Sequence, residues 1–209
     1  MKSLVSLVTA TLLGFTSLIA FTGDIYIENS NGGQSAKSKI VTKGSKIKHE
    51  LPDNRGALII DGEKAEIIIL MDDTRQYIVQ KIGASDDLVI EGEVHIIEGE
   101  EEILGLPTRK FVLVEENGGK FIISATASIQ NVAFAKMPGV TQGLTEQMKE
   151  VFGSTDVLTM RMENYNRSGD LMMKMEATEL VEREVADSEF LPPAGYTELV
   201  LPKLPAQPE

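Results

Sequence analysis

The sequence contains no cysteine, no tryptophan and only two histidines in 209 residues. Without cysteine, neither disulfide bonds nor an acylated lipoprotein cysteine can form, so a packed core alone must stabilise the fold. A thiol nucleophile is excluded for the same reason. The formal net charge of −12 would repel nucleic acid and anionic membrane surfaces. We therefore expect no nucleic-acid partner.

The sequence also has few features of an enzyme. It contains no nucleophile elbow, no glycine-rich phosphate loop and no paired-histidine motif. The two histidines, His49 and His95, are too far apart in sequence to indicate a metal site, and His49 lies on an apolar strand face that suits a core or rim position. The acidic groups at residues 72–73 and 98–102 lack the spacing of a calcium motif, so we interpret them as solvated turns. We expect a non-enzymatic protein with no catalytic residue, no metal and no cofactor.

The N-terminal segment has the pattern of a secretory signal peptide. Lys2 precedes an apolar and small-residue run from Leu4 to Phe21, and no further charge occurs before Asp24. We expect cleavage after Ala20, so that residues 1–20 are a signal peptide and the protein is exported, either periplasmic or extracellular. No stable membrane span would then remain. The alternative is an uncleaved membrane anchor, which needs about 20 strongly apolar residues, whereas threonines and serines interrupt this run.

The rest of the chain has the length of one domain. We expect a folded domain over residues 21–201 and a disordered tail over residues 202–209, where prolines recur without periodicity. Alternating apolar runs around Lys43-Gly44 and Asp61-Gly62 predict an antiparallel meander in the first half. The run Ile67 to Met71 is apolar at every position, which predicts a strand that is covered on both faces.

One amphipathic helix is predicted in the second half, in "GLTEQMKEVFG". Its apolar residues fall at i, i+4, i+7 and i+8, and they are Leu144, Met148, Val151 and Phe152. Gly153 fits the stop position that follows them. The sequence therefore predicts a mainly β domain of the α+β class with a single short helix.

Three segments of the sequence carry a family resemblance. They are "IIDGEKAEIIILMDDTRQYIVQ", "ILGLPTRKFVLVEENGGKFIISA" and the closing "SEFLPPAGYTEL", which has the pattern Phe-x-x-Pro-x-Gly-Tyr. In their order and spacing they resemble the exported bacterial domain-of-unknown-function family 4412, over about residues 21 to 199. The chain departs from the family pattern because it lacks a cysteine after "GLP" and a tryptophan at Ile122 or Ile123.

The resemblance implies a fold similar to that of the lipoprotein-carrier proteins of the bacterial periplasm. Such a fold is a strongly curved antiparallel sheet, or incomplete β-barrel, with a short helix against the concave side. In this fold the last strand would reach an edge of the sheet. Phe190 and Tyr196 would seal its rim, and Pro192 and Pro193 would stop further pairing.

The leading functional hypothesis is an exported protein that binds a lipid or another apolar molecule in the concave sheet. The residues expected to form a lid are Leu144, Met148, Val151 and Phe152. Flexible thioethers suit varied apolar ligands, and the residues expected to line the floor are Ile68, Leu70, Met160, Met162, Met173 and Met175. The alternatives are an envelope structural or protein-interaction domain with a filled core, and an uncharacterised hydrolase.

Overall fold

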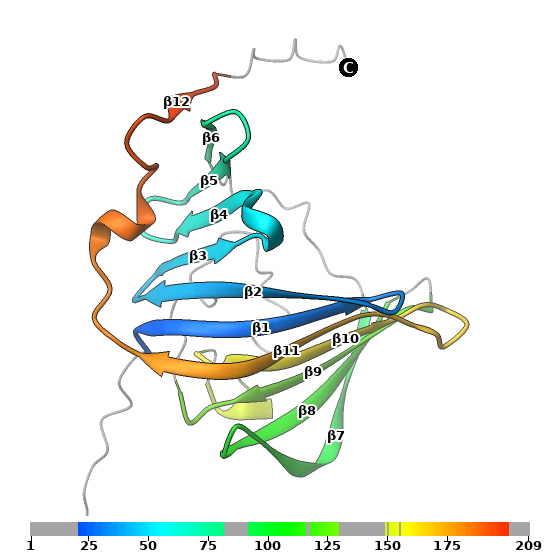
Figure 1. Cartoon of the computed structure of the whole chain (residues 1–209). Coiled ribbons are helices and arrows are strands. Elements are labelled where there is room, and N and C mark those ends of the chain that lie inside the picture. Colours follow the sequence, from blue (N-terminus) through cyan, green and yellow to red (C-terminus); the bar gives the residue numbers. More distant parts are fainter. Residues whose placement is uncertain are drawn as a thin grey trace, which may run out of the picture.

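The computed structural model describes residues 21–81, 92–115, 118–129, 149, 151–154 and 156–200. These residues form one sheet of twelve strands (Figure 1). The strands are β1 (Gly23–Asn31), β2 (Gln34–Lys43), β3 (Lys46–Glu50), β4 (Gly56–Asp61), β5 (Glu66–Met71), β6 (Gln76–Lys81), β7 (Gly92–Ile103), β8 (Leu106–Glu115), β9 (Lys120–Thr126), β10 (Leu158–Tyr165), β11 (Leu171–Glu182) and β12 (Thr197–Glu198). Two short 3-10 turns, η1 (Pro52–Asn54) and η2 (Asp187–Phe190), accompany the strands.

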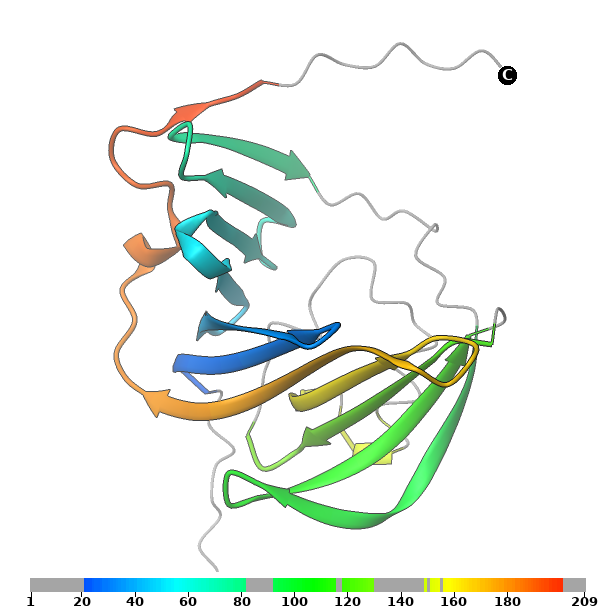
Figure 2. The same ribbon diagram turned by 45° about the vertical axis from the view of Figure 1, so that its right-hand side comes forward.

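The strand order in the sheet is β12-β6-β5-β4-β3-β2-β1-β11-β10-β9-β8-β7, so the sheet is open and ends at β12 and β7. Every pairing is antiparallel except the short parallel pairing of β12 with β6. Figure 2 shows that the sheet bends into an open curve. The prediction of a mainly β domain built on a curved antiparallel sheet is therefore confirmed. In the part of the chain that the structure describes, no helix is long and apolar enough to cross a membrane.

The predicted hairpins are present, but one of them turns differently from expectation. The β4–β5 hairpin follows Asp61, whose carboxylate accepts hydrogen bonds from the backbone N–H groups of Glu63 and Lys64, both at 3.1 Å. The residue with left-handed backbone in this turn is Ala65, at φ 51°, and not the glycine of the Asp-Gly pair. The aspartate side chain, which substitutes for a backbone acceptor, thus sets this turn.

The two faces of the sheet carry different cores, because neighbouring residues of a strand point to opposite faces. We call outer the face of β2–β6 along which the C-terminal segment runs, on the outside of the curve (Figures 1 and 2). The outer cluster on this face consists of Val41, Ala57, Ile59, Ile68, Leu70, Val185 and Phe190. The inner cluster lies on the opposite face around β1, β10 and β11, and consists of Ile25, Ile27, Ile103, Leu158, Met160 and Ala177.

Arg183 holds the C-terminal segment against β1. Its guanidinium donates to both carboxylate oxygens of Asp24, at 2.7 and 2.8 Å, and to both of Glu189, also at 2.7 and 2.8 Å. The hydrogen bonds from Arg183 lower the pKa of Glu189 to about 2. These paired charge-assisted bonds fix the segment that carries Phe190 over the outer face.

The closing segment reaches the edge of the sheet, as its sequence predicted. Phe190 is buried in the outer cluster, and the Tyr196 hydroxyl donates to Asp72 at 2.5 Å. The expectation that the two prolines stop further pairing is wrong. The N–H groups of Thr197 and Leu199 donate to carbonyls of β6 and its turn, at 3.0 and 2.7 Å, so pairing resumes after the prolines as β12.

The predicted helix is described only at its C-terminal end. Lys149, Val151 and Phe152 are helical, and the N–H of Gly153 donates to the Lys149 carbonyl at 2.8 Å. Gly153 has φ 70°, the left-handed conformation that a helix stop requires. Leu144, Met148, the signal peptide over residues 1–20 and the tail over residues 202–209 lie outside the described residues.

Candidate binding face and adjoining hollow

The structure separates the residues that were expected to line one floor. Ile68 and Leu70 belong to the outer cluster, where Val185 and Phe190 cover them. Met160 is only 1% exposed and lies in the inner cluster, so it is a core residue. The aliphatic and methionine parts of the predicted floor therefore lie on opposite faces of the sheet.

The other three methionines remain together on the inner face. Met162 and Met175 are cross-strand partners on β10 and β11, and Met173 follows on the same face of β11. On the neighbouring strand β1, Asn29 is the cross-strand partner of Met175 and Asn31 is the cross-strand partner of Met173. All three methionines are half-buried.

Two residues of the predicted lid are described, and both lie near β8. Val151 is buried, and the ring of Phe152 meets the ring of Phe111 edge to face, with centroids 5.9 Å apart. The pair Phe111 and Phe152 thus anchors the end of the helical turn on β8. This contact lies in the half of the sheet that contains the inner cluster.

The inner face of β3–β6 is apolar and uncharged, and sequence analysis did not single it out. Its aliphatic residues alternate with those of the outer cluster and are Ile47, Leu58, Ile60, Ile67, Ile69 and Ile78. We call these six residues the aliphatic face. All but Ile60 are half-buried, and none packs in the clusters that the described residues form.

The remaining residues on the same side of these four strands carry no formal charge. By strand alternation they are His49, Gly56, Met71, Gln76 and Gln80. In a chain with a formal net charge of −12, a run of four strands without a charged inward residue is a distinctive surface. It can take up an apolar chain without burying a charge.

A polar group borders the aliphatic face at β3. His49 is the cross-strand partner of Leu58, and its Nε2 lies 3.1 Å from the Ser38 hydroxyl oxygen. The Asn29 side-chain amide donates to the same hydroxyl oxygen at 2.9 Å. The Ser38 hydrogen is then available for His49 Nε2. Among the described residues, no carboxylate forms a hydrogen bond with the imidazole.

A hollow opens beside this polar group, between the β1–β2 hairpin and η1. Its volume is about 1190 Å³, and residues that line it include Asn29, Asn31, Gln34, His49, Arg55 and Met173. Since His49 lines the hollow and pairs with Leu58, the aliphatic face and the hollow adjoin at this residue. Together, the aliphatic face and the hollow form an apolar surface next to a polar cavity.

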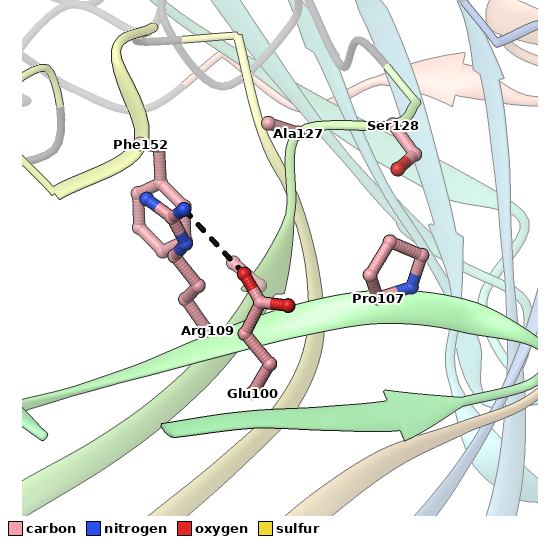
Figure 3. Close-up of a pocket in the computed structure, with 7 residues that line it drawn as sticks. Glu100, Pro107, Arg109, Ala127, Ser128 and Phe152 are labelled. Atoms are coloured by element: carbon pink, nitrogen blue, oxygen red, sulfur yellow. Dashed lines mark hydrogen bonds and ion pairs between the residues drawn. The ribbon is translucent and has the colours of Figure 1, made fainter. Parts of the chain in front are cut away.

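A smaller pocket of about 300 Å³ lies next to the helical turn (Figure 3). Figure 3 shows Arg109 between Glu100 and Phe152, all three of which line the pocket. Arg109 donates to the Val151 carbonyl at 3.1 Å and lies 3.5 Å from a carboxylate oxygen of Glu100. Because these partners engage the guanidinium, we interpret the pocket as the junction that holds the turn against β8.

The outer face of β7–β11 is charged and paired. Arg161 lies 3.1 Å from Glu101 and 3.0 Å from Glu176, and Lys110 lies 2.9 Å from Glu101. The hydrogen bond from Arg161 lowers the pKa of Glu176. This network joins residues of β7, β8, β10 and β11 on the outer face.

The pKa of His49 is lowered by burial, which predicts a pH-dependent stability. At a pH below the ordinary histidine pKa of 6.5, the unfolded chain binds a proton at His49 that the folded protein binds less readily. The free energy of unfolding should therefore fall as the pH falls from 7.5 to 5. In His49→Gln this part of the pH dependence should disappear. Urea unfolding of both proteins at the two pH values measures it. Identical pH dependence in the variant and the wild type would contradict the assignment.

The fold and these surfaces define an open, curved antiparallel sheet whose inner face is aliphatic in one half and bordered by a polar hollow. Residues 21–196 match the family described as a domain of unknown function, DUF4412, so the chain belongs to this family. The family resemblance seen in the sequence is thus confirmed. No curated protein matches the sequence.

Solved structures share the fold at low sequence identity. An uncharacterized conserved protein from Thermus thermophilus is 9% identical, with a TM-score of 0.56 over 84% of this chain and 88% of its own. PNGF-II is 14% identical, with a TM-score of 0.52 over 86% of this chain but only 31% of its own. The complex of MucA and MucB from Pseudomonas aeruginosa contains a chain that is 13% identical, with a TM-score of 0.48 over 82% of this chain and 55% of its own. At these identities the first two show the fold alone, and the third supports no further conclusion.

Proposed function

We propose that the protein is an exported, non-enzymatic binding protein that holds the acyl chain of a lipid on the aliphatic face. The proposal keeps the predicted ligand and changes its site. The acyl chain of the ligand would lie on Ile47, Leu58, Ile67, Ile69 and Ile78 instead of on Ile68 and Leu70. The periplasm or the extracellular space, as the N-terminal pattern predicts, is the proposed location.

The observation that supports this proposal is the uncharged, half-exposed aliphatic inner face of β3–β6. Both clusters around it are filled by side chains of the described residues, whereas these six residues share no cluster with them. Each methylene of an acyl chain that is transferred from water contributes about 0.8 kcal/mol. An acyl chain that lies along the four strands would therefore bind favourably, even after the free-energy cost of ordering the acyl chain is subtracted.

The three half-buried methionines suit the same ligand class. Met162, Met173 and Met175 lie on the inner face of β10 and β11, and Met173 lines the hollow. Their flexible thioethers would accommodate chains of differing length. Met160, by contrast, is a core residue, so a charged substitution there would test stability and not binding.

A second candidate is a protein-interaction domain of the cell envelope. Met160 at 1% exposure and its neighbours Ile25 and Ile27 favour it, because this part of the interior is filled as such a domain requires. The half-exposed aliphatic face would then meet an apolar segment of another protein. Uptake of free lipid separates the two candidates.

Ile69→Asp is expected to weaken the binding of a fluorescent long-chain fatty acid at least tenfold. A carboxylate in the middle of the aliphatic face would lose its hydration against the alkyl chain, and a tenfold loss corresponds to only about 1.4 kcal/mol. Fluorescence titration of the protein from residue 21 measures the dissociation constant, and far-UV circular dichroism shows whether the sheet is intact. Ile69→Gln provides a milder second variant if the aspartate disturbs folding.

The matched control is Met172→Asp. Met172 is 47% exposed and lies on β11, which β1 and β2 separate from β3–β6 in the sheet. It should leave fatty-acid binding unchanged. Equal affinity in the wild type and in both Ile69 variants would contradict the site, and no uptake by the wild type would leave the interaction domain as the better proposal.

A further inference from the structure

Two cations at the hollow have no carboxylate partner. Lys37 and Arg55 both line it, and neither lies within 4.0 Å of a carboxylate among the residues that the structure describes. The register of Lys37 with Glu28 places it on the face of β2 opposite to Gln34, so it approaches the hollow across the edge of β2 that extends beyond β3. The other lysines of β2 and β3 are all paired. Lys39, Lys43, Lys46 and Lys48 each lie 3.2 or 3.3 Å from an acidic side chain. In so acidic a chain, two unpaired cations at one hollow point to an anionic ligand.

Neutral donors accompany these cations. The side-chain amides of Asn31 and Gln34 line the hollow and form no hydrogen bond with another described side chain. The lining contains one carboxylate, that of the exposed Asp53. Its single negative charge is outweighed by the two cations, so the lining carries a formal positive charge.

The backbone of η1 holds Arg55 at the mouth of the hollow. Asp53 and Asn54, directly before it, have φ of 60° and 52°, the left-handed conformation that residues with a side chain seldom adopt. The Arg55 Nε donates to the Pro52 carbonyl at 3.4 Å, which leaves the two terminal nitrogens of the guanidinium for another acceptor. A guanidinium with both terminal nitrogens available suits a bidentate contact with a carboxylate or a phosphate.

We infer that the hollow binds the anionic head group, a carboxylate or a phosphate, of the molecule whose acyl chain lies on the aliphatic face. This inference rests on the proposed function and names the class of lipid. Arg55 pairs with the anion, Asn31 and Gln34 donate hydrogen bonds to it, and Lys37 adds positive charge from across the edge of β2. His49 lies between the two regions, since it lines the hollow and pairs with Leu58 across the β3–β4 ladder. One amphiphile can therefore occupy both.

The test compares two ligands with the same chain and different head groups, hexadecanoate and hexadecanol, at pH 8 and low salt. The wild type is expected to bind hexadecanoate at least tenfold more tightly than hexadecanol. The double variant Lys37→Gln, Arg55→Gln should lose this preference by weakening hexadecanoate alone. Isothermal titration calorimetry with the protein from residue 21 measures both affinities. Raising the salt concentration should narrow the difference in the wild type.

Lys64→Gln is the matched control, because Lys64 is an exposed lysine that pairs with Asp61 in the β4–β5 turn, away from the hollow lining. It should keep the full preference for hexadecanoate. Equal binding of both ligands by the wild type, or a preference that survives in the double variant, would overturn the head-group site and leave the acyl-chain site standing.

Inorganic phosphate distinguishes the sources of the anion. If phosphate competes with hexadecanoate and its binding is lost in the double variant, the anion site is supported. If phosphate binds and neither long-chain ligand does, the proposed lipid function fails and the lipid head group is overturned with it. If the wild type binds hexadecanol as tightly as hexadecanoate and binds no phosphate, only the head-group inference fails.

Discussion

Phe190→Ala is expected to lower the free energy of unfolding by about 3 to 5 kcal/mol. The ring is 4% exposed and packs with Val41, Ile59 and Leu70 from three strands of the outer cluster. Its removal leaves a cavity under a segment that Arg183 fixes to β1, so the surroundings cannot collapse freely to fill it. Urea denaturation followed by circular dichroism measures the loss.

Leu191→Ala is the matched control for this prediction. Leu191 is the next residue and is 52% exposed, so its truncation should change the free energy of unfolding by less than about 0.5 kcal/mol. A loss in Phe190→Ala as small as that in Leu191→Ala would show that the C-terminal segment does not cover the outer face in solution.

The outer cluster explains which parts of the fold could be predicted from the sequence. The apolar run from Ile67 to Met71 predicted a strand covered on both faces. β5 is covered on its outer side, where Phe190 packs, but its inner residues Ile67 and Ile69 are only half-buried, so the prediction is correct for one face only. Alternation has a period of two residues, so it separates the faces of a strand without showing what covers each. The segment that covers Ile68 lies more than a hundred residues later in the chain, and no local pattern predicts that contact.

The same ambiguity explains the predicted floor. Ile68 and Leu70 were grouped with the methionines because both sets are apolar, whereas the register places Ile67 and Ile69 on the inner side. If the face assignment of a strand is shifted by one residue, all of its apolar residues move to the opposite face of the sheet. The absence of a carboxylate partner for Lys37 and Arg55 could not be predicted from the sequence either, because it depends on which carboxylates the fold brings near each cation.

Gly56→Ala is expected to lower the free energy of unfolding by about 4 kcal/mol or more, which is exceptional for one methyl group. Gly56 opens β4, faces Met71 of β5 and has φ 137°. A Cβ atom there would lie 1.9 Å from the Leu70 carbonyl oxygen, a backbone atom that cannot move without opening the β4–β5 ladder. Leu70 belongs to the outer cluster, so the ladder and the packing would be disturbed together.

Gly33→Ala separates this close approach from the cost of an unusual backbone angle. Gly33 has φ 84° in the β1–β2 turn, and nothing lies within 4 Å of its would-be Cβ. Its substitution should therefore cost only the left-handed conformation, about 1 to 2 kcal/mol. Urea unfolding of both variants measures the difference. If Gly56→Ala costs no more than Gly33→Ala, the contact between Gly56 and Leu70 is not as close as the structure places it, and the aliphatic face, which depends on the same β4–β5 register, would have to be reassigned.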